Sequence, residues 1–190
     1  ALLFIFKLFK NELFLYAVFT GLALGLAFLS KYAALYFLVL FIIWWIIYDR
    51  GNNINTKNLF LLVSTSFVIS SSNIYWNYLN DFVTVSHTVS NADLKNIILN
   101  DNNVIEFLSS QLLVFGPIMF LLYIFIVFDS FVKNKILSLL ALLSLPIIIL
   151  ITIQSFLKIA NANWAVSAYI AATLILSAYS AKSGRCVLFC

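Results

Sequence analysis

A single lysine interrupts a long apolar stretch near the start of the chain. Lys31 lies in LSKYAALY, between the apolar runs LFLYAVFTGLALGLAF and FLVLFIIWWIIY. A lysine at a helix end can extend its ammonium group to the membrane surface, which is one interpretation of this position. Held in a short turn beside Tyr32 and Tyr36, the same ammonium group could instead pair with a phosphate. Spacing alone leaves both interpretations open.

Polar and aromatic residues follow the third apolar run. The segment NIYWNYLNDFVTVSHTVS contains Trp76, Asn77 and the single histidine of the chain, His87. The aromatic residues suit an interfacial belt. His87 could act as a general base, or it could be an ordinary polar residue of a loop. Because no second metal ligand accompanies it, we expect no zinc site.

A similar segment precedes the last apolar run. SFLKIANANWAVSAY contains Lys158, Asn163 and Trp164. These residues could anchor the chain at the membrane surface, or they could form a polar and aromatic rim for a sugar or a lipid head group. No serine–histidine–aspartate motif, phosphate loop, nucleotide fingerprint or paired-carboxylate motif is present.

The composition indicates the elements that position these residues. The chain has 190 residues, of which 64% are hydrophobic and only 9% are charged, and its mean hydropathy is +1.06. A soluble domain has about a quarter charged residues, so we predict an integral membrane protein. The net charge of +4 then reflects membrane topology rather than a nucleic-acid partner. The two cysteines, Cys186 and Cys190, form neither a disulfide framework nor a metal motif.

Hydropathy and length predict an all-α, polytopic transmembrane helical bundle with about six spans. One helix from Leu13 to Tyr48 would be about 54 Å long at about 1.5 Å per residue, whereas the hydrocarbon core is about 30 Å thick. We therefore predict two helices with a tight turn at Ser30–Lys31. The six spans form a single transmembrane domain over residues 1–190: Leu13–Ser30, Tyr32–Tyr48, Leu59–Tyr75, Phe107–Phe128, Ile136–Ile153 and Trp164–Ala181.

The basic residues predict the orientation of these spans. One side of the bundle has eight of them and the other has Lys31, Lys95 and Lys158, so the positive-inside rule places both termini in the cytoplasm. The membrane expected is the bacterial inner membrane. Residues 76–106 then form an extracytoplasmic loop. The eight are Lys7, Lys10, Arg50, Lys57, Lys133, Lys135, Lys182 and Arg185.

Two glycine patterns predict local helix geometry. Gly21 and Gly25 form a Gly-x-x-x-Gly motif, which permits close helix packing, and we expect that packing within the chain rather than between copies. Gly116–Pro117 predicts a kink in the fourth span.

Four stretches, taken together and in order, resemble a known family. They are GLALGLAFLSKYAALYF, NIYWNYLNDFVTVSHT, EFLSSQLLVFGPIMF and NANWAVSAY, which cover roughly Gly21 to Tyr169. The chain resembles the polytopic family-39-type glycosyltransferases of bacteria, a group related to protein O-mannosyltransferases and to the aminoarabinose transferase that acts on lipid A.

The resemblance implies a GT-C-type membrane fold and an activity. Such enzymes move a sugar from a polyprenyl-phosphate carrier to a lipid, glycan or protein acceptor on the extracytoplasmic face, with inversion. Lys31 matches the Ser-Lys-Tyr position of the family and would contact the carrier phosphate. No cofactor is evident, and although some GT-C enzymes use a divalent metal, the sequence shows no site for one. The candidate substrate-binding residues are Lys31, Tyr32, Trp76, Asn77, His87, Gln111, Lys158, Asn163 and Trp164.

The chain also departs from the family pattern. Ala165 stands where the family usually has proline after Asn-Trp, and no proline follows Ser-Lys-Tyr. The catalytic carboxylate of the family lies in an outer loop that would precede Ala1, so the catalytic residues of this chain stay unknown. We therefore expect the C-terminal part of such an enzyme, active or a remnant of one. The alternative from the sequence is a multi-span component of a transporter or flippase.

Overall fold

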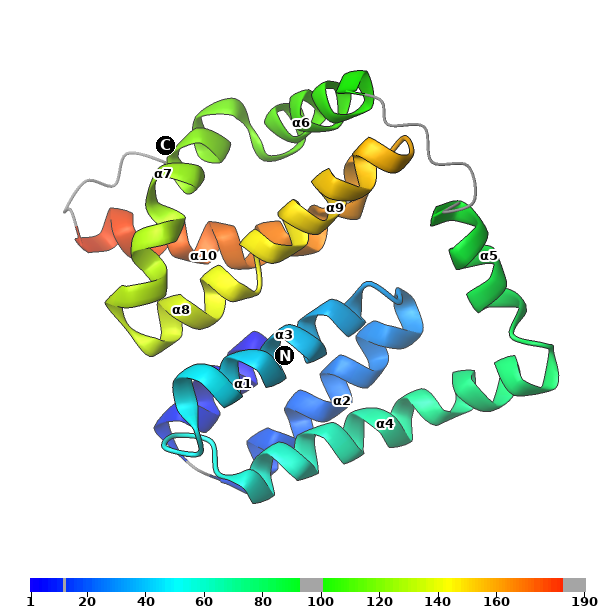
Figure 1. Ribbon diagram of the computed structural model, residues 1–190. Coiled ribbons are helices and arrows are strands. Elements are labelled where there is room, and N and C mark those ends of the chain that lie inside the picture. Colours follow the sequence, from blue (N-terminus) through cyan, green and yellow to red (C-terminus); the bar gives the residue numbers. More distant parts are fainter. Residues whose placement is uncertain (12, 93–100, 183–190) are drawn as a thin grey trace. The chain divides into compact units, whose positions relative to one another are not determined.

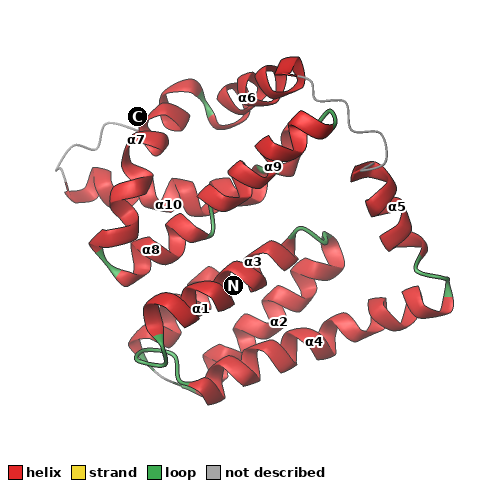
Figure 2. Ribbon diagram, viewed as in Figure 1, coloured by secondary structure: helices red, strands yellow, loops and turns green. Residues whose placement is uncertain are grey.

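The computed structural model describes residues 1–11, 13–92 and 101–182 (Figure 1). Figure 2 shows helices joined by short loops throughout these ranges, with no strand among the described residues. The prediction of an all-α helical bundle is confirmed. The helices are α1 (Leu2–Lys10), α2 (Phe14–Ser30), α3 (Ala34–Trp44) with the π-helical turn η1 (Trp45–Asp49), α4 (Thr56–Leu79), α5 (Val83–Ala92), α6 (Asp101–Phe115), α7 (Pro117–Lys133), α8 (Lys135–Leu142), α9 (Leu145–Leu157), the 3-10 turn η2 (Ala162–Trp164) and α10 (Val166–Lys182).

The chain divides into two compact units, while the single transmembrane domain over residues 1–190 stays a prediction. Unit 1 is Ala1–Asn91 and unit 2 is Ala92–Cys190. Hydropathy could not separate them, because both consist of apolar helices of the same kind. Each unit is described by itself below.

Two glycines set the packing of unit 1. A Cβ atom on Gly21 would lie 2.5 Å from the carbonyl oxygen of Leu62, and one on Gly25 would lie 2.6 Å from Cβ of Ile69. Only glycine lets the backbones of α2 and α4 approach this closely. The predicted packing of the glycine motif within the chain is therefore confirmed. Because Gly21 meets Leu62 and Gly25 meets Ile69, α2 and α4 run in the same direction.

A hydrogen-bonded loop connects α3 to α4 at the opposite end from the α2–α3 turn. The carboxylate of Asp49, which is buried, accepts hydrogen bonds from the backbone nitrogen of Asn53 at 3.1 Å and from that of Ile54 at 2.8 Å. Asn55 then caps α4 by accepting from the nitrogen of Asn58 at 2.8 Å. This loop fixes where α4 begins.

Unit 2 contains one sharply bent helix pair and one broken helix. The axes of α6 and α7 differ by 103° at Gly116, whose φ is +87°, followed by Pro117 at the start of α7. The predicted kink is confirmed, and the left-handed backbone of Gly116 explains its sharpness. Between α8 and α9, the hydroxyl of Tyr123 donates to Ser144 Oγ at 2.8 Å, so the buried break has an internal polar partner.

The apolar helices overlap the six predicted spans, but fewer than six of them reach the length of a span. Among the described residues, two helices are long and apolar enough to cross a bilayer, Thr56–Leu79 and Lys135–Leu157, and the bent pair Asp101–Phe115 with Pro117–Lys133 is a third if it counts as one span. Three shorter apolar helices, Phe14–Ser30, Ala34–Asp49 and Val166–Ala181, coincide with the remaining predicted spans.

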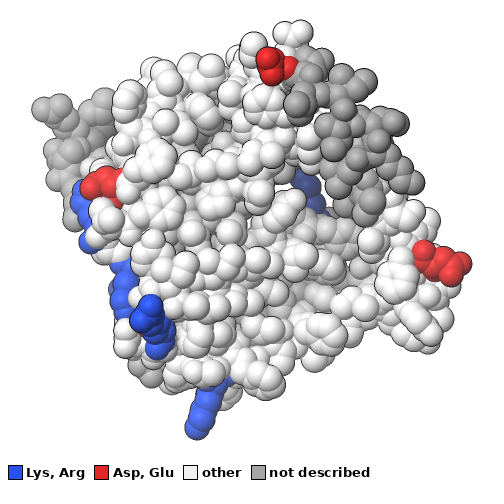
Figure 3. Space-filling view, in the orientation of Figure 1, with Lys and Arg blue, Asp and Glu red and all other residues white. Residues whose placement is uncertain are grey.

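The surface of these helices suits contact with lipid. Large apolar side chains face outward on both units, including Phe60, Phe67, Leu113, Phe125 and Val132. The face drawn in Figure 3 is almost entirely uncharged. An apolar exterior over long helices is typical of proteins embedded in a bilayer.

The segment predicted as an extracytoplasmic loop is largely helical. The helix α4 continues to Leu79 rather than ending at Tyr75, and α5 occupies Val83–Ala92. The next helix, α6, begins at Asp101. Polarity made residues 76–106 resemble a loop, but polar residues on an exposed helix give the same composition. Residues 93–100, which include Asp93 and Lys95, lie outside the described residues.

Candidate functional site

The turn between α2 and α3 presents Lys31 and Tyr32 at one end of unit 1. Helix α2 ends at Ser30, and Lys31 follows in an extended conformation, so the predicted turn is confirmed. The Tyr32 hydroxyl lies 3.0 Å from Asn73 Oδ1 on α4 and 2.9 Å from Thr84 Oγ1 on α5. Three elements therefore meet at one phenol group.

Asn77 completes this arrangement, which we name the Tyr32 cluster: Tyr32, Asn73, Asn77 and Thr84. Asn77 is only 3% exposed. Its amide nitrogen donates to Asn73 Oδ1 at 3.1 Å and to the Asn73 carbonyl at 3.0 Å, and it lies 3.4 Å from the Tyr32 hydroxyl. Its amide oxygen accepts from the Thr84 hydroxyl. A buried amide with both ends satisfied holds its neighbours in fixed places.

Local backbone geometry explains why these residues meet. Asn73 and Asn77 are one helical turn apart and share a face of α4. After Leu79 the chain turns through Asp81 and Phe82, whose φ values are +52° and +53°. The Phe82 nitrogen donates to the Asn77 carbonyl at 2.8 Å. This left-handed pair brings the first turn of α5, and Thr84 with it, back toward Asn77.

Hydrogen bonding also changes the acidity of Tyr32. The hydrogen bond with Thr84 lowers the pKa of the Tyr32 phenol from its ordinary value, and the contacts with Asn77 and Asn73 act in the same direction. They lower it because hydroxyl and amide donors that turn toward the phenol oxygen once its proton is lost stabilise the ionised form. Burial acts the other way, but the hydrogen bonds dominate.

The other predicted residues of unit 1 lie close to this cluster along the chain. Lys31 is exposed and directly precedes Tyr32. Trp76 is 48% exposed on α4. His87 is exposed on α5, one turn beyond Thr84, and its carbonyl accepts from Ser90 Oγ at 2.9 Å. Of the predicted residues in unit 1, the hydrogen bonds thus join Tyr32 and Asn77.

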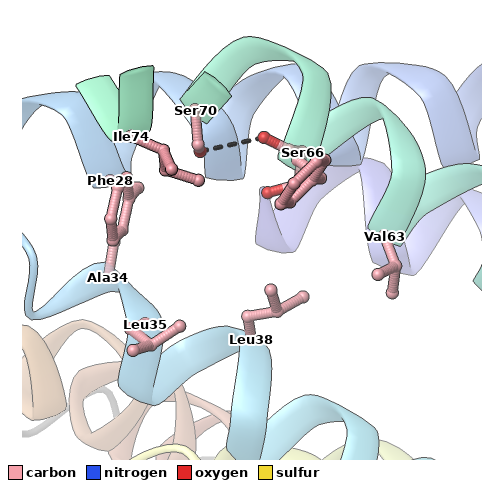
Figure 4. Close-up of a pocket in the computed structure, with 9 residues that line it drawn as sticks. Phe28, Ala34, Leu35, Leu38, Val63, Ser66, Ser70 and Ile74 are labelled. Atoms are coloured by element: carbon pink, nitrogen blue, oxygen red, sulfur yellow. Dashed lines mark hydrogen bonds between the residues drawn. The ribbon is translucent and has the colours of Figure 1, made fainter. Parts of the chain in front are cut away.

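An apolar cavity of about 150 Å³ adjoins the Tyr32 cluster (Figure 4). Phe28 lines it, and the Phe28 ring lies 5.1 Å from the Tyr32 ring. The polar groups of its wall include the hydroxyl of Ser70, which donates to the Ser66 carbonyl at 2.9 Å. Such a cavity suits an alkyl chain better than a sugar. The remaining lining residues are Ala34, Leu35, Leu38, Val63, Phe67 and Ile74.

A second polar cluster lies in unit 2 around Gln111, which is fully buried. Its amide oxygen accepts from the Tyr169 hydroxyl, and its amide nitrogen donates to the Ala162 carbonyl at 3.3 Å. The Phe115 ring stacks on the Tyr169 ring with centroids 4.3 Å apart. The structure therefore joins two motifs that were separate in the sequence, the Gln of EFLSSQ and the NANW turn.

The remaining predicted residues of unit 2 lie on or beside that turn. Asn163 is exposed and Trp164 is partly exposed, both in η2. Lys158 follows the last residue of α9 and is also partly exposed. Gln111 thus supports the turn that carries Asn163 and Trp164, and its contact with substrate stays a prediction.

Sequence reasoning missed three residues of these clusters: Asn73, Thr84 and Tyr169. Asn73 could have been found from its spacing of four residues from Asn77, which places it on the same helix face. Tyr169 carried no such signal, because its partner Gln111 lies 58 positions away in the sequence. Thr84 carried none either, because Tyr32 lies 52 positions away and its nearer partner, Asn77, is on another helix, beyond a left-handed turn.

Comparison with known proteins finds a related protein. The chain is similar to a lipid A galacturonosyltransferase. The relative, Lipid A galacturonosyltransferase RgtD of Rhizobium johnstonii, is 34% identical over 164 residues, which are 84% of this chain and 34% of the relative. The chain thus spans about a third of the length of the curated relative it matches. No family model and no solved structure matches the chain.

The similarity supports the coarser part of the prediction from sequence, a membrane glycosyltransferase. The apolar helices agree with it. The assignment to the family-39 type within the GT-C enzymes stays a prediction.

Proposed function

We propose that this chain is part of a membrane glycosyltransferase that moves a sugar from a polyprenyl-phosphate donor to an acceptor on the extracytoplasmic face. The observation that supports this most directly is the similarity to a lipid A galacturonosyltransferase. By that similarity, the first sugar to test is galacturonic acid and the first acceptor is lipid A.

The arrangement of unit 1 suits a lipid-linked donor. The apolar cavity would hold part of the prenyl chain, since its lining residues are mostly aliphatic or aromatic. The ammonium group of Lys31, in the turn beside that cavity, would pair with the carrier phosphate. As the sugar transfers, the phosphate gains negative charge on the departing oxygen, and a positioned cation stabilises that charge.

The transfer needs a general base, and we assign no residue of this chain to that role. An acceptor hydroxyl would attack the anomeric carbon, the bond from that carbon to the phosphate oxygen would break, and the acceptor proton would pass to a general base. The resemblance described above assigns this role to a carboxylate that no residue of this chain matches. We therefore assign the residues of this chain to donor binding rather than to proton transfer.

A transfer assay tests the proposal. The protein, expressed from its native gene and reconstituted in lipid nanodiscs, is supplied with radiolabelled polyprenyl-phosphate galacturonic acid and lipid A. We expect labelled lipid A, and we expect Lys31→Ala to reduce the turnover at least about tenfold through the lost phosphate contact. Lys57→Ala is the matched control, because Lys57 is an exposed lysine just inside the start of α4.

Two results would contradict the proposal at different levels. Unchanged turnover in Lys31→Ala would remove the phosphate assignment. Movement of the lipid-linked donor across the bilayer without any transfer would favour the transporter or flippase alternative instead.

A further inference from the structure

We propose that the Tyr32 cluster binds the sugar of the lipid-linked donor through neutral hydrogen bonds, with Asn73 and Tyr32 as the contacts and Thr84 and Asn77 as positioning residues. This inference rests on the proposed function. It separates the sugar contacts from the phosphate contact at Lys31, and it adds Asn73 and Thr84, which neither sequence nor comparison assigns.

The number of hydroxyl protons in the cluster determines which of its groups donate and which accept. The Thr84 hydroxyl gives its one proton to the amide oxygen of Asn77, so the Thr84 oxygen must accept from Tyr32. The phenol proton of Tyr32 is therefore shared between Thr84 Oγ1 and Asn73 Oδ1. Both hydroxyl protons of the cluster are thus donated in hydrogen bonds within the cluster.

The same count leaves one group directed away from the cluster. Asn73 Oδ1 accepts from both Tyr32 and Asn77, which fixes the oxygen of its amide toward the cluster. The two amide N–H donors of Asn73 must then point the other way, and within the described residues they make no hydrogen bond. Asn73 is only partly buried, so a ligand can reach these donors.

The chemical character of the cluster favours a sugar hydroxyl over an anion. Its four side chains are two amides, a phenol and an alcohol, and none of them is charged at neutral pH. A sugar hydroxyl both accepts and donates, so it can accept from Asn73 Nδ2 and donate to the Tyr32 oxygen. A phosphate prefers charge-assisted donors, which Lys31 supplies one residue earlier.

The roles of Thr84 and Asn77 follow from the same contacts. Neither offers a free proton to a ligand, because the Thr84 proton goes to Asn77 and the Asn77 amide donates to Asn73. They act by fixing the Tyr32 hydroxyl and the Asn73 amide. Thr84 also ties α5 to the α2–α3 turn.

Two lipid probes distinguish sugar binding from phosphate binding. Binding of bare polyprenyl phosphate and of polyprenyl-phosphate galacturonic acid is measured for the protein in nanodiscs. We expect Asn73→Ala to weaken binding of the sugar-linked lipid about tenfold and to leave binding of the bare lipid unchanged. Lys31→Ala should weaken binding of both lipids, because both contain the phosphate.

Two further variants separate positioning from general stability. Thr84→Val should weaken only the sugar-linked lipid, and Thr84→Ser should restore it, because serine keeps the hydroxyl. Asn80→Ala, which removes an exposed amide at the C-cap of α4, is the control and should bind both lipids as the wild type does.

The outcomes separate this inference from the proposed function. If Lys31→Ala weakens both lipids while Asn73→Ala and Thr84→Val bind both normally, the sugar subsite is wrong and the donor assignment stands. If Asn73→Ala and Thr84→Val weaken both lipids equally, the cluster has a structural role only. If the wild type binds neither lipid, both proposals fail.

Discussion

Tyr32 illustrates how much of this site depends on distant residues. Its hydroxyl contacts Asn73 and Thr84, which follow it by 41 and 52 positions. Each of these side chains is neutral, and alone each would be an ordinary polar residue near a helix end. Together they hold the phenol in one place and lower its pKa.

The lowered pKa of Tyr32 gives a prediction that does not depend on activity. Thr84→Val should raise the pKa of the phenol toward its ordinary value, because the first cause of the shift is lost. Titration of tyrosinate absorbance measures this, with Tyr32→Phe subtracted to isolate the signal of Tyr32. An identical Tyr32 titration in both proteins would contradict the hydrogen bond.

The sign of the corresponding stability change follows from linkage. Because the native pKa lies below the unfolded one, the native state loses its proton first as the pH rises. The contribution of the Tyr32 ionisation to the free energy of unfolding is therefore fully present above the pKa of the unfolded state. It is lost as the pH falls through the pKa of the native state, so at neutral pH the Tyr32 ionisation adds nothing to stability.

The pair Gln111 and Tyr169 gives a second prediction at this scale. Gln111→Leu leaves the buried phenol of Tyr169 without its acceptor, which costs about 1–3 kcal/mol of the free energy of unfolding. Combining it with Tyr169→Phe should recover part of that loss, since both polar partners are then gone. Denaturant unfolding in detergent micelles measures the cycle. Strictly additive losses would show that the two groups do not interact.

Helices α2 and α4 are held together by the absence of side chains rather than by large ones. At Gly21 the facing atom is the backbone carbonyl oxygen of Leu62, which cannot rotate out of the way. In a bilayer, where lipid is as apolar as leucine, close backbone contact is a main source of helix association. The α2–α4 contact in turn places the Tyr32 cluster at the far end of both helices.

Gly21→Ala tests this contact. The added methyl group would lie 2.5 Å from the Leu62 oxygen, so we expect a loss of about 1–3 kcal/mol in the free energy of unfolding. Leu26→Ala, at a position of α2 that is 58% exposed, is the matched control and should change stability much less. Equal losses in the two variants would show that the packing at Gly21 is loose.

At the scale of the whole molecule, the distribution of basic residues predicts which ends of the helices face the cytoplasm. In unit 1, Lys31 follows the end of α2, whereas Arg50 and Lys57 flank the loop at the opposite end of α3 and α4. The positive-inside rule then places Lys31 outside and the loop inside.

Cysteine labelling tests that orientation. In a chain with Cys186 and Cys190 replaced by serine, Lys31→Cys should react with a membrane-impermeant maleimide in intact cells. Lys57→Cys should react only after the membrane is opened. The reverse pattern would invert the topology, and with it the face on which we place the donor.

The helices themselves could largely be predicted from the sequence, because hydrophobic length and glycine or proline position act locally. The turn at Lys31, the packing of Gly21 and Gly25 and the bend at Gly116 were all found in this way. The helix over 83–92 was not, because its polar residues have the composition of a loop. Of the candidate site, Tyr32 and Asn77 were named, but Asn73 and Thr84 were not.

The sequence by itself determined that the chain is apolar and all-helical and that Lys31 follows the end of α2. It also carries the resemblance to glycosyltransferases. Hydropathy and charge suffice for these because each depends on the residue and its near neighbours. Only the tertiary structure decided that Lys31 stands beside a neutral cluster and an apolar cavity. That depends on two parallel helices packed through glycine and on a left-handed turn at Asp81 and Phe82, which bring neutral side chains together over distances along the chain that no local pattern encodes.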